Sequence, residues 1–318
     1  MISIAKLMNY VPRSKQGATT KINIQVTPAP GSEDTTAQAV TLDKYTKLLG
    51  TDINGVNYPF VTLYSNTSVK SAGSFSFANV NIKQGEVVTR QFLMDPQNTR
   101  RRFKIPSANV DITTLAVSVQ ESTTNTYTTV YSQYDDITLV DGSTPAYFVE
   151  EDVDLNYTIY FGDDIIGVKP KNGSVVTVSY LDTVGELANN ISKFSFTDKI
   201  GGKYSSNVSV TATTPTYGAA KKETVEEIRF RAPHHYTVQN RAVTSNDYEA
   251  LILKDFPFVD GVSVWGGEDN DPVVYGKVYL SLKPKTNYIL TTKQKEEIKQ
   301  TLIRTRNVMT IIPEIVDP

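Results

Sequence analysis

Neighbouring carboxylates are the side chains of this sequence whose types and spacing could do chemistry. Four clusters occur: Asp135-Asp136, Glu150-Glu151-Asp152, Asp163-Asp164 and Glu268-Asp269-Asn270-Asp271. A pair of carboxylates can hydrolyse glycosidic bonds when the pKa of one is raised and a defined distance separates the two. Each cluster is expected in a turn at a strand end, where solvated Asp and Asn favour the bend itself. We therefore predict no catalytic residues and no enzyme activity.

Metal and cofactor sites are the next chemistry to consider. The only histidines, His234 and His235, are adjacent, and the chain has no cysteine, so carboxylates would have to complete a transition-metal site. Residues 268–271 offer oxygen ligands for calcium but lack the loop spacing and terminal glutamate of a helix-loop-helix site. No Gly-rich phosphate loop, nucleophile elbow or dinucleotide fingerprint is present. The sequence predicts loop or interface packing for the histidines, and neither a metal nor a cofactor.

The sharpest run of positive charge is Arg100-Arg101-Arg102. Phosphate binding would need more basic neighbours and interleaved aromatic side chains. The formal net charge of −2 also argues against broad binding to nucleic acid. Two interpretations remain: a solvated strand edge, whose charges oppose edge pairing, and a charged contact with a neighbouring subunit.

Composition places the chain among globular proteins built from several domains. It has 318 residues, of which 39% are hydrophobic and 21% charged, which is enough apolar material for real cores. No run of 18 apolar residues and no basic-then-apolar leader is present, so neither a membrane contact nor a signal peptide is expected. The absence of cysteine fits assembly in a reducing cytoplasm. Abundant Tyr, Phe, Thr and Val favour strands and protein interfaces.

The sequence of the first two thirds of the chain predicts short strands. Residues 21–27, 60–64 and 74–82 alternate polar and apolar side chains, and 43–49 fits either a brief helix or a bent strand. Residues 87–183 show seven short candidate strands with turn signals between them, which predicts a sandwich or small barrel. Residues 184–221 return to strands. We expect 1–86 and 184–221 to form an N-terminal β domain, with 87–183 inserted; a linear string of domains is the alternative.

Residues 222–318 form an expected C-terminal α+β domain. Helices are predicted over about 225–230, 245–255 and 291–306, and strands over 261–265, 276–283 and 310–316. Thr224, Thr244 and Thr291 are each followed three residues later by a capping acid or amide. Pro233 is predicted to end the first helix. The expected fold class is mainly β, with short-stranded sandwich or barrel units and a C-terminal split βαβ-like sandwich.

Two motifs carry a family resemblance. Arg231-Ala232-Pro233, a spacer, and then Asn240-Arg241-Ala242-Val243-Thr244-Ser245-Asn246-Asp247-Tyr248 resemble the signature of the baseplate J-like family. Upstream, Tyr160-Phe161-Gly162-Asp163-Asp164 and the residues through Gly173 resemble the family's Phe-Gly-Asp-Gly turn, with Asp164 where the family usually has glycine. The family-motif residues, all read as structural, are Phe161, Gly162, Asp163, Gly173, Arg231, Pro233, Arg241, Thr244, Asp247 and Tyr248. Arg241 is expected to brace the turn before the second helix through backbone carbonyls or Asp247.

The resemblance implies a structural wedge component of a contractile phage tail baseplate. Such proteins form homodimers that build a ring around the tail hub, bind other wedge proteins and move as the baseplate changes state. The Asn- and Thr-rich character is most similar to the T-even type, in which a long N-terminal part precedes this region. We therefore expect the chain to be the C-terminal part of such a protein, located in the virion tail.

Two other functions stay open from the residues alone. A host-surface glycan-binding tail protein would need exposed Trp or Tyr grouped on one sheet face, and Trp265 is the only tryptophan. Burial is expected for Trp265, whereas exposure would mark a subunit contact. A hydrolase using the paired carboxylates is the third hypothesis.

Overall fold

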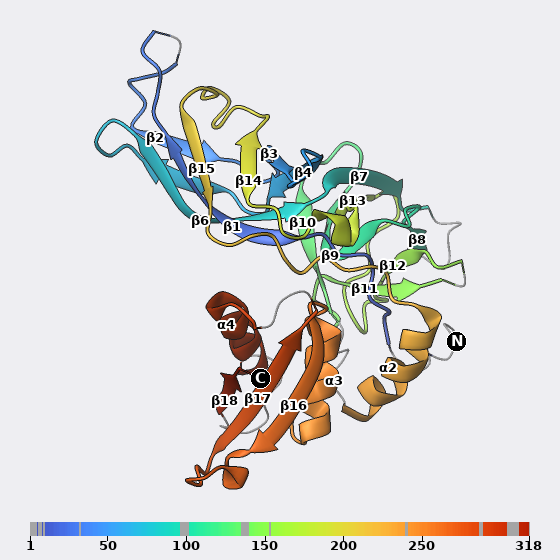
Figure 1. Ribbon diagram of the computed structural model, residues 1–318. Coiled ribbons are helices and arrows are strands. Elements are labelled where there is room, and N and C mark those ends of the chain that lie inside the picture. The colour runs from blue at the N-terminus through green and yellow to red at the C-terminus, as the bar shows by residue number, and fades with distance from the viewer. Residues whose placement is uncertain are drawn as a thin grey trace. The chain divides into compact units, whose positions relative to one another are not determined.

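The protein is described from a computed structural model that covers residues 5, 8, 10–31, 33–95, 102–134, 140–152, 154–238, 241–285, 289–303 and 312–317. The chain divides into two compact units, one of residues 14–222 and one of residues 1–13 with 223–318 (Figure 1). Each unit has its own buried core.

The larger unit is built from short strands, as its alternating sequence predicts. In chain order the strands are β1 (Thr19–Val26), β2 (Ala39–Leu42), β3 (Lys47–Thr51), β4 (Asn57–Thr62), β5 (Asn66–Val69), β6 (Phe75–Gln84), β7 (Glu86–Leu93), β8 (Arg102–Lys104), β9 (Val110–Gln120), β10 (Thr128–Gln133), β11 (Ala146–Glu151), β12 (Tyr157–Phe161), β13 (Val175–Asp182), β14 (Lys193–Phe196) and β15 (Val208–Ala212). A short 3-10 helix, η2 (Gly185–Ala188), lies between β13 and β14. The segment 43–49, left open between helix and strand, becomes strand β3 from Lys47 onward.

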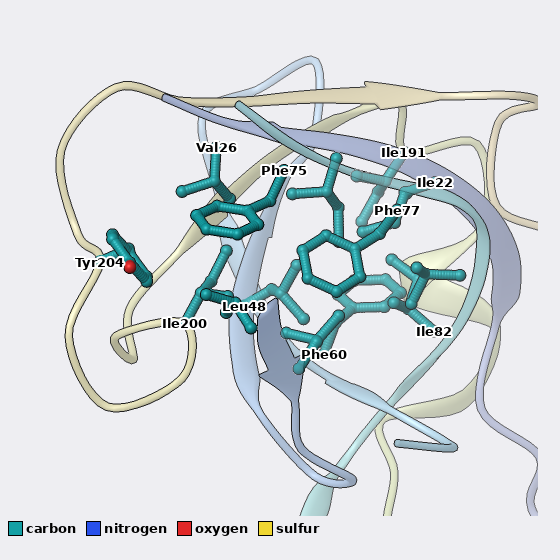
Figure 2. Packing of buried hydrophobic residues seen from close by; sticks show 14 of the residues in the cluster. Ile22, Val26, Leu48, Phe60, Phe75, Phe77, Ile82, Ile191, Ile200 and Tyr204 are labelled. Carbon is teal, nitrogen blue, oxygen red and sulfur yellow. The ribbon is translucent and has the colours of Figure 1, made fainter. Parts of the chain in front are cut away.

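One six-stranded sheet has the order β14-β3-β4-β6-β1-β15. In β1 every second side chain is buried, which is the pattern of a strand with one face on a core. Its outer strands, β14 and β15, also lie close to each other, so the sheet curls toward a barrel. The interior is filled by aliphatic and aromatic side chains, among them Phe60, Phe75 and Phe77 (Figure 2). The strands β2 and β5 form a separate two-stranded sheet.

The seven strands expected within residues 87–183 form one seven-stranded sheet, in the order β7-β13-β9-β10-β11-β12-β8. Its two outer strands are brought together by Phe92 of β7 and Phe103 of β8, whose ring centroids are 5.1 Å apart. Phe103 also contacts Phe161 of β12 at 6.0 Å. Because the outer strands share one core, the sheet is nearly closed, and the barrel-like alternative of the prediction is the one observed.

The smaller unit contains the helices and the third sheet. Its elements are α2 (Val225–Val238), α3 (Ser245–Asp255), β16 (Val259–Gly266), η3 (Gly267–Asp269), β17 (Lys277–Pro284), α4 (Thr292–Thr301) and β18 (Ile312–Val316). The sheet order is β16-β17-β18, with β16 and β17 antiparallel and β17 and β18 parallel across α4. Leu280 and Leu282 of β17 pack with Leu251 and Ile252 of α3 and Ile298 of α4. The mainly β fold class with a C-terminal α+β region is therefore confirmed.

The prediction that Pro233 ends the first helix is wrong. Helix α2 continues through Pro233 to Val238, so His234 and His235 are helical and do not lie in a loop. A proline inside a helix costs about 3 kcal/mol through its missing amide and its steric clash. Three contacts oppose that cost: His235 packs on the Tyr10 ring, Val238 is buried in the core, and the Thr237 hydroxyl donates to the Pro233 carbonyl.

Where the structure describes them, the remaining boundaries follow the predictions closely. Helix α4 begins with the expected cap at Thr291, and the end of the predicted helix at 304–306 lies outside the described residues. Pro313 lies in β18 at the edge of its sheet, as expected. The three-domain division at residues 86/87, 183/184 and 221/222 stays a prediction, with β14 and β15 pairing to β3 and β1 in its support.

No described helix is long and apolar enough to cross a membrane.

Candidate functional site

A buried ionic cluster ties the N-terminal segment to the start of α2 within the smaller unit. The Glu223 side chain is fully buried and accepts a hydrogen bond from Arg231 Nη1 at 3.0 Å. The Tyr10 hydroxyl lies 2.8 Å from each Glu223 oxygen, and the Arg13 backbone amide donates to Oε2 at 2.9 Å. The motif residue Arg231 therefore holds a carboxylate located just before its own helix.

Arg13 is the second cation of this cluster. Only 9% of its side chain is exposed, and its Nη2 lies 4.0 Å from Glu227. Burial lowers the pKa of Arg13, and the nearby Arg231 guanidinium lowers it further. Burial also raises the pKa of Tyr10, as does the Glu223 carboxylate. A carboxylate with three donors and a tyrosine whose pKa is raised are suited to holding chain segments together.

Sequence reasoning missed Tyr10, Arg13 and Glu223. Tyr10 and Glu223 are 213 residues apart in the chain, so no local pattern joins them. One signal was available: Glu223 directly precedes the cap residue Thr224, a position from which a side chain can turn back toward the helix start.

A pocket of about 200 Å³ lies between α2 and α3. Tyr10 and Phe230 line it together with both histidines, His234 and His235. The His234 ring is 4.8 Å from that of Phe230, and the Lys254 Nζ lies 3.3 Å from His235 Nδ1. The histidines thus line a concave surface. In the described part of the chain, no group of three or more His, Asp or Glu is placed to hold a metal ion.

The motif at the start of α3 forms the predicted cap. The Thr244 hydroxyl accepts from the Asp247 amide, while the Asp247 carboxylate accepts from the Thr244 amide at 2.8 Å. The same carboxylate accepts from the Val243 amide at 3.2 Å. Tyr248 follows, with its ring in the core of the smaller unit. Arg241 donates its backbone amide to Val238 at 3.1 Å, and the expected bracing by its side chain stays a prediction.

The upstream motif forms a tight turn after β12 in the larger unit. At Gly162 a Cβ atom would lie 2.0 Å from the Ile166 carbonyl oxygen, so any side chain would collide with backbone. Asp163 accepts from the amides of Ile165 and Ile166, at 3.1 and 3.2 Å. Asp164, where the family usually has glycine, adopts a left-handed φ of 73° and accepts from the Lys169 amide at 2.8 Å. The turn is therefore tight despite the substitution, because aspartate tolerates this conformation.

The other two upstream motif residues lie on either side of this turn. Phe161 is buried, with its ring 5.3 Å from that of Tyr131. Gly173 has a φ of +84° in a turn closed by Ser174, and its amide donates to Met94 at 2.9 Å. The ten motif residues thus fall into two groups in different compact units, and their structural roles stay predictions.

The acidic clusters divide between solvated turns and paired side chains. Asp135 and Asp136 lie outside the described residues, as do Arg100 and Arg101. Glu151 differs from the expectation of a solvated carboxylate: it is buried and forms an ion pair with Lys222. A chain segment 71 positions away supplies this cation, which is why local turn chemistry did not reveal it.

Arg102 lies on the outer strand β8, pairs with Glu150 and packs on the Tyr160 ring at 4.9 Å.

Trp265 is partly buried. Its ring stacks on Tyr279 of the neighbouring strand β17, with centroids 5.9 Å apart, and its Nε1 donates to Asn270 at 2.9 Å. Both rings lie on the sheet face opposite Leu280, which belongs to the core. The expectation of simple burial is therefore only half met.

Sequence comparisons relate the chain to baseplate proteins. Residues 244–316 match the family model "Baseplate structural protein gp6, C-terminal domain I". Over 341 aligned residues the chain is 25% identical to "Baseplate wedge protein gp6" of Enterobacteria phage T4, an alignment that covers 100% of this chain and 49% of the relative. The chain thus spans about half the length of that relative.

A structural comparison matches the whole chain to 60% of a chain in "Cryo-EM structure of the anti-feeding prophage (AFP) baseplate, 6-fold symmetrised", at 13% identity. Its TM-score of 0.30 is too low to support any argument about fold or function. Residues 244–316 are therefore similar to the C-terminal domain I of the baseplate structural protein gp6, and the whole chain resembles the C-terminal part of a T-even-type baseplate wedge protein, which places it in the virion tail baseplate.

Proposed function

We propose that this chain is a structural wedge component of a contractile phage tail baseplate that forms homodimers. In this proposal the homodimers build a ring around the tail hub, bind other wedge proteins and take part in the baseplate conformational change. One observation carries the proposal: the similarity to the wedge protein of phage T4 extends along the whole of this chain.

The described structure supports a role in assembly. Several large apolar side chains are exposed, including Phe230 and Tyr236 on α2, which are 66% and 63% exposed. Exposed aromatic residues dominate the energetics of protein interfaces, and stable interfaces bury about 1,200–2,000 Å² in total. The division into two compact units, each with its own core, suits a protein whose parts act as rigid bodies.

Electrostatics in the acidic turns support a non-enzymatic role. A general acid in glycoside hydrolysis needs a raised carboxyl pKa. Hydrogen bonds from the Ile166 and Ile165 amides instead lower the pKa of Asp163. Hydrogen bonds from Thr144 and Ser143 lower the pKa of Asp141 in the same way. These carboxylates are held ionised as turn acceptors, so we propose that the chain has no hydrolytic activity.

Two measurements test the proposal. Mass spectrometry of purified phage particles and of isolated baseplates should find the chain in both preparations, enriched in the baseplates. Multi-angle light scattering of the purified chain, across micromolar concentrations, should give a mass approaching twice the 35.2 kDa of one chain. Absence from the baseplate would overturn the structural role, whereas a strict monomer would overturn only the homodimer.

A further inference from the structure

The pocket between α2 and α3 has the size of a site for one side chain. Pockets that enclose drug-sized ligands measure roughly 300–1,000 Å³. The observed volume of about 200 Å³ is smaller, and its walls include the apolar side chains of Phe230, Val238 and Leu253. Such a pocket fits the anchor of a protein interface, where one large side chain fills a largely apolar hollow.

The rim of this pocket is basic. Lys254, His234 and His235 line it together with Arg231, which is already paired with the buried Glu223, and the one carboxylate among the lining residues is that of Glu249. The Lys254 ammonium lies near both His235 Nδ1 and the Tyr10 ring, at 3.3 Å and 5.8 Å. A ligand for this surface should therefore combine one large apolar or aromatic side chain with carboxylates beside it.

The loop between β16 and β17 of the same chain has this chemistry. Tyr275 is 83% exposed and Val273 is 50% exposed, which is unusual for such side chains. Glu268, Asp269 and Asp271 are exposed carboxylates, and residues 266–276 include no lysine or arginine. The loop offers an anchor beside three negative charges, which complements the pocket in both respects.

The loop is also held in shape before any partner binds. The Val274 amide donates to the Gly267 carbonyl at 2.9 Å, and Asn270 accepts from Trp265 Nε1 at 2.9 Å. A Cβ at Gly267 would lie 1.8 Å from the Val274 oxygen, so the two sides of the loop are in close contact. A preorganised loop loses less conformational entropy on docking than a flexible one.

We propose that the acidic loop of residues 268–275 docks into the α2–α3 pocket of a second copy of this chain, with Tyr275 as its anchor. This inference rests on the proposed function, since it names a surface for the self-association that function requires. Tyr275 enters between Phe230 and Leu253, and the loop carboxylates face Lys254 and its basic neighbours. The same contact can be made twice in a two-fold dimer or repeated head to tail around a ring.

Variants of the full chain test the contact by sedimentation or light scattering across micromolar concentrations. Tyr275→Ser removes the anchor, and Lys254→Glu reverses the pocket charge. Each should weaken self-association by about tenfold or more, as expected for loss of an interface anchor or of charge complementarity. Tyr127→Ser, at a residue 69% exposed in the other compact unit, is the matched control and should leave self-association unchanged. Circular dichroism checks that every variant is folded.

A charge exchange makes the test specific. The Lys254→Glu chain has an acidic pocket and an acidic loop, whereas an Asp269→Lys, Asp271→Lys chain has a basic pocket and a basic loop. Neither should self-associate, but an equimolar mixture should, because each loop then meets a pocket of opposite charge. If the wild type associates while Tyr275→Ser behaves as the control does, or if the mixture does not recover association, this inference is wrong and the homodimer stands. If the wild type stays monomeric, both fail.

Discussion

One buried ion pair links the two sheets of the larger unit. Strands β6 and β7 belong to different sheets and are separated only by Gly85. Beside this crossing, the fully buried Asp111 of β9 accepts from Lys83 Nζ at 2.8 Å and from the Gly17 amide at 2.9 Å. Thr113 donates to the other carboxylate oxygen through its amide and its hydroxyl. One carboxylate thus joins β9, β6 and the segment before β1.

Replacing Lys83 by Met keeps most of the aliphatic stem and removes the positive charge from this network. Removing one partner of a buried ion pair costs about 3–5 kcal/mol, because it leaves an uncompensated charge. Lys83 is 14% exposed, and the Gly17 and Thr113 bonds to Asp111 remain, so we expect the lower end, about 3 kcal/mol. For a domain of this size that corresponds to a melting temperature lower by roughly 6–12 °C.

Guanidinium unfolding followed by far-ultraviolet circular dichroism measures this loss, since strands dominate the larger unit. Lys21→Met is the matched control: Lys21 is exposed on the neighbouring strand β1, and its replacement should change stability by less than about 0.5 kcal/mol. Trp265 belongs to the other compact unit, so its fluorescence transition should not move. A Lys83→Met variant as stable as Lys21→Met would refute the reasoning that this ion pair holds the sheets together.

Three further outcomes are expected. Thr244→Ala removes the hydroxyl that caps α3 and should destabilise the smaller unit by about 1 kcal/mol, seen as an earlier Trp265 fluorescence transition; an unchanged midpoint would contradict the role of the cap. Gly162→Ala forces a Cβ onto the Ile166 carbonyl and should cost about 1–3 kcal/mol in the circular dichroism transition, so a neutral effect would show that the turn can relax. Hydrogen bonds from the Ala29 and Ser206 amides lower the pKa of Glu33 from 4.5 to about 2, so its stabilisation is complete above pH 4.5 and is lost as pH falls toward 2. Glu33→Gln should therefore flatten the fall in melting temperature over that interval, and identical acid profiles would argue against this linkage.

The elements that were predicted correctly from the sequence depend on interactions between residues close together in the chain. The cap at Thr244 needs only a hydroxyl and a carboxylate three residues apart, and the alternation in β1 needs only a period of two. Helix α3 and the predicted strands of the β region were therefore found close to their observed bounds. The turn at Asp164 could not be predicted from the motif alone. The family usually has glycine there, but aspartate adopts the same left-handed conformation.

The amino-acid sequence by itself determined which segments form strands and helices and where their caps and tight turns lie, since these depend on neighbours within a few positions. Only the tertiary structure decided that α2 runs through Pro233, that Glu223 lies buried between Tyr10 and Arg231, and that Asp111 meets Lys83. Each of these depends on groups distant in the chain, whose contact energies outweigh local preferences of a few kcal/mol once the fold brings them together. The pocket between α2 and α3 belongs to the same class, because its walls come from residues separated by more than two hundred positions.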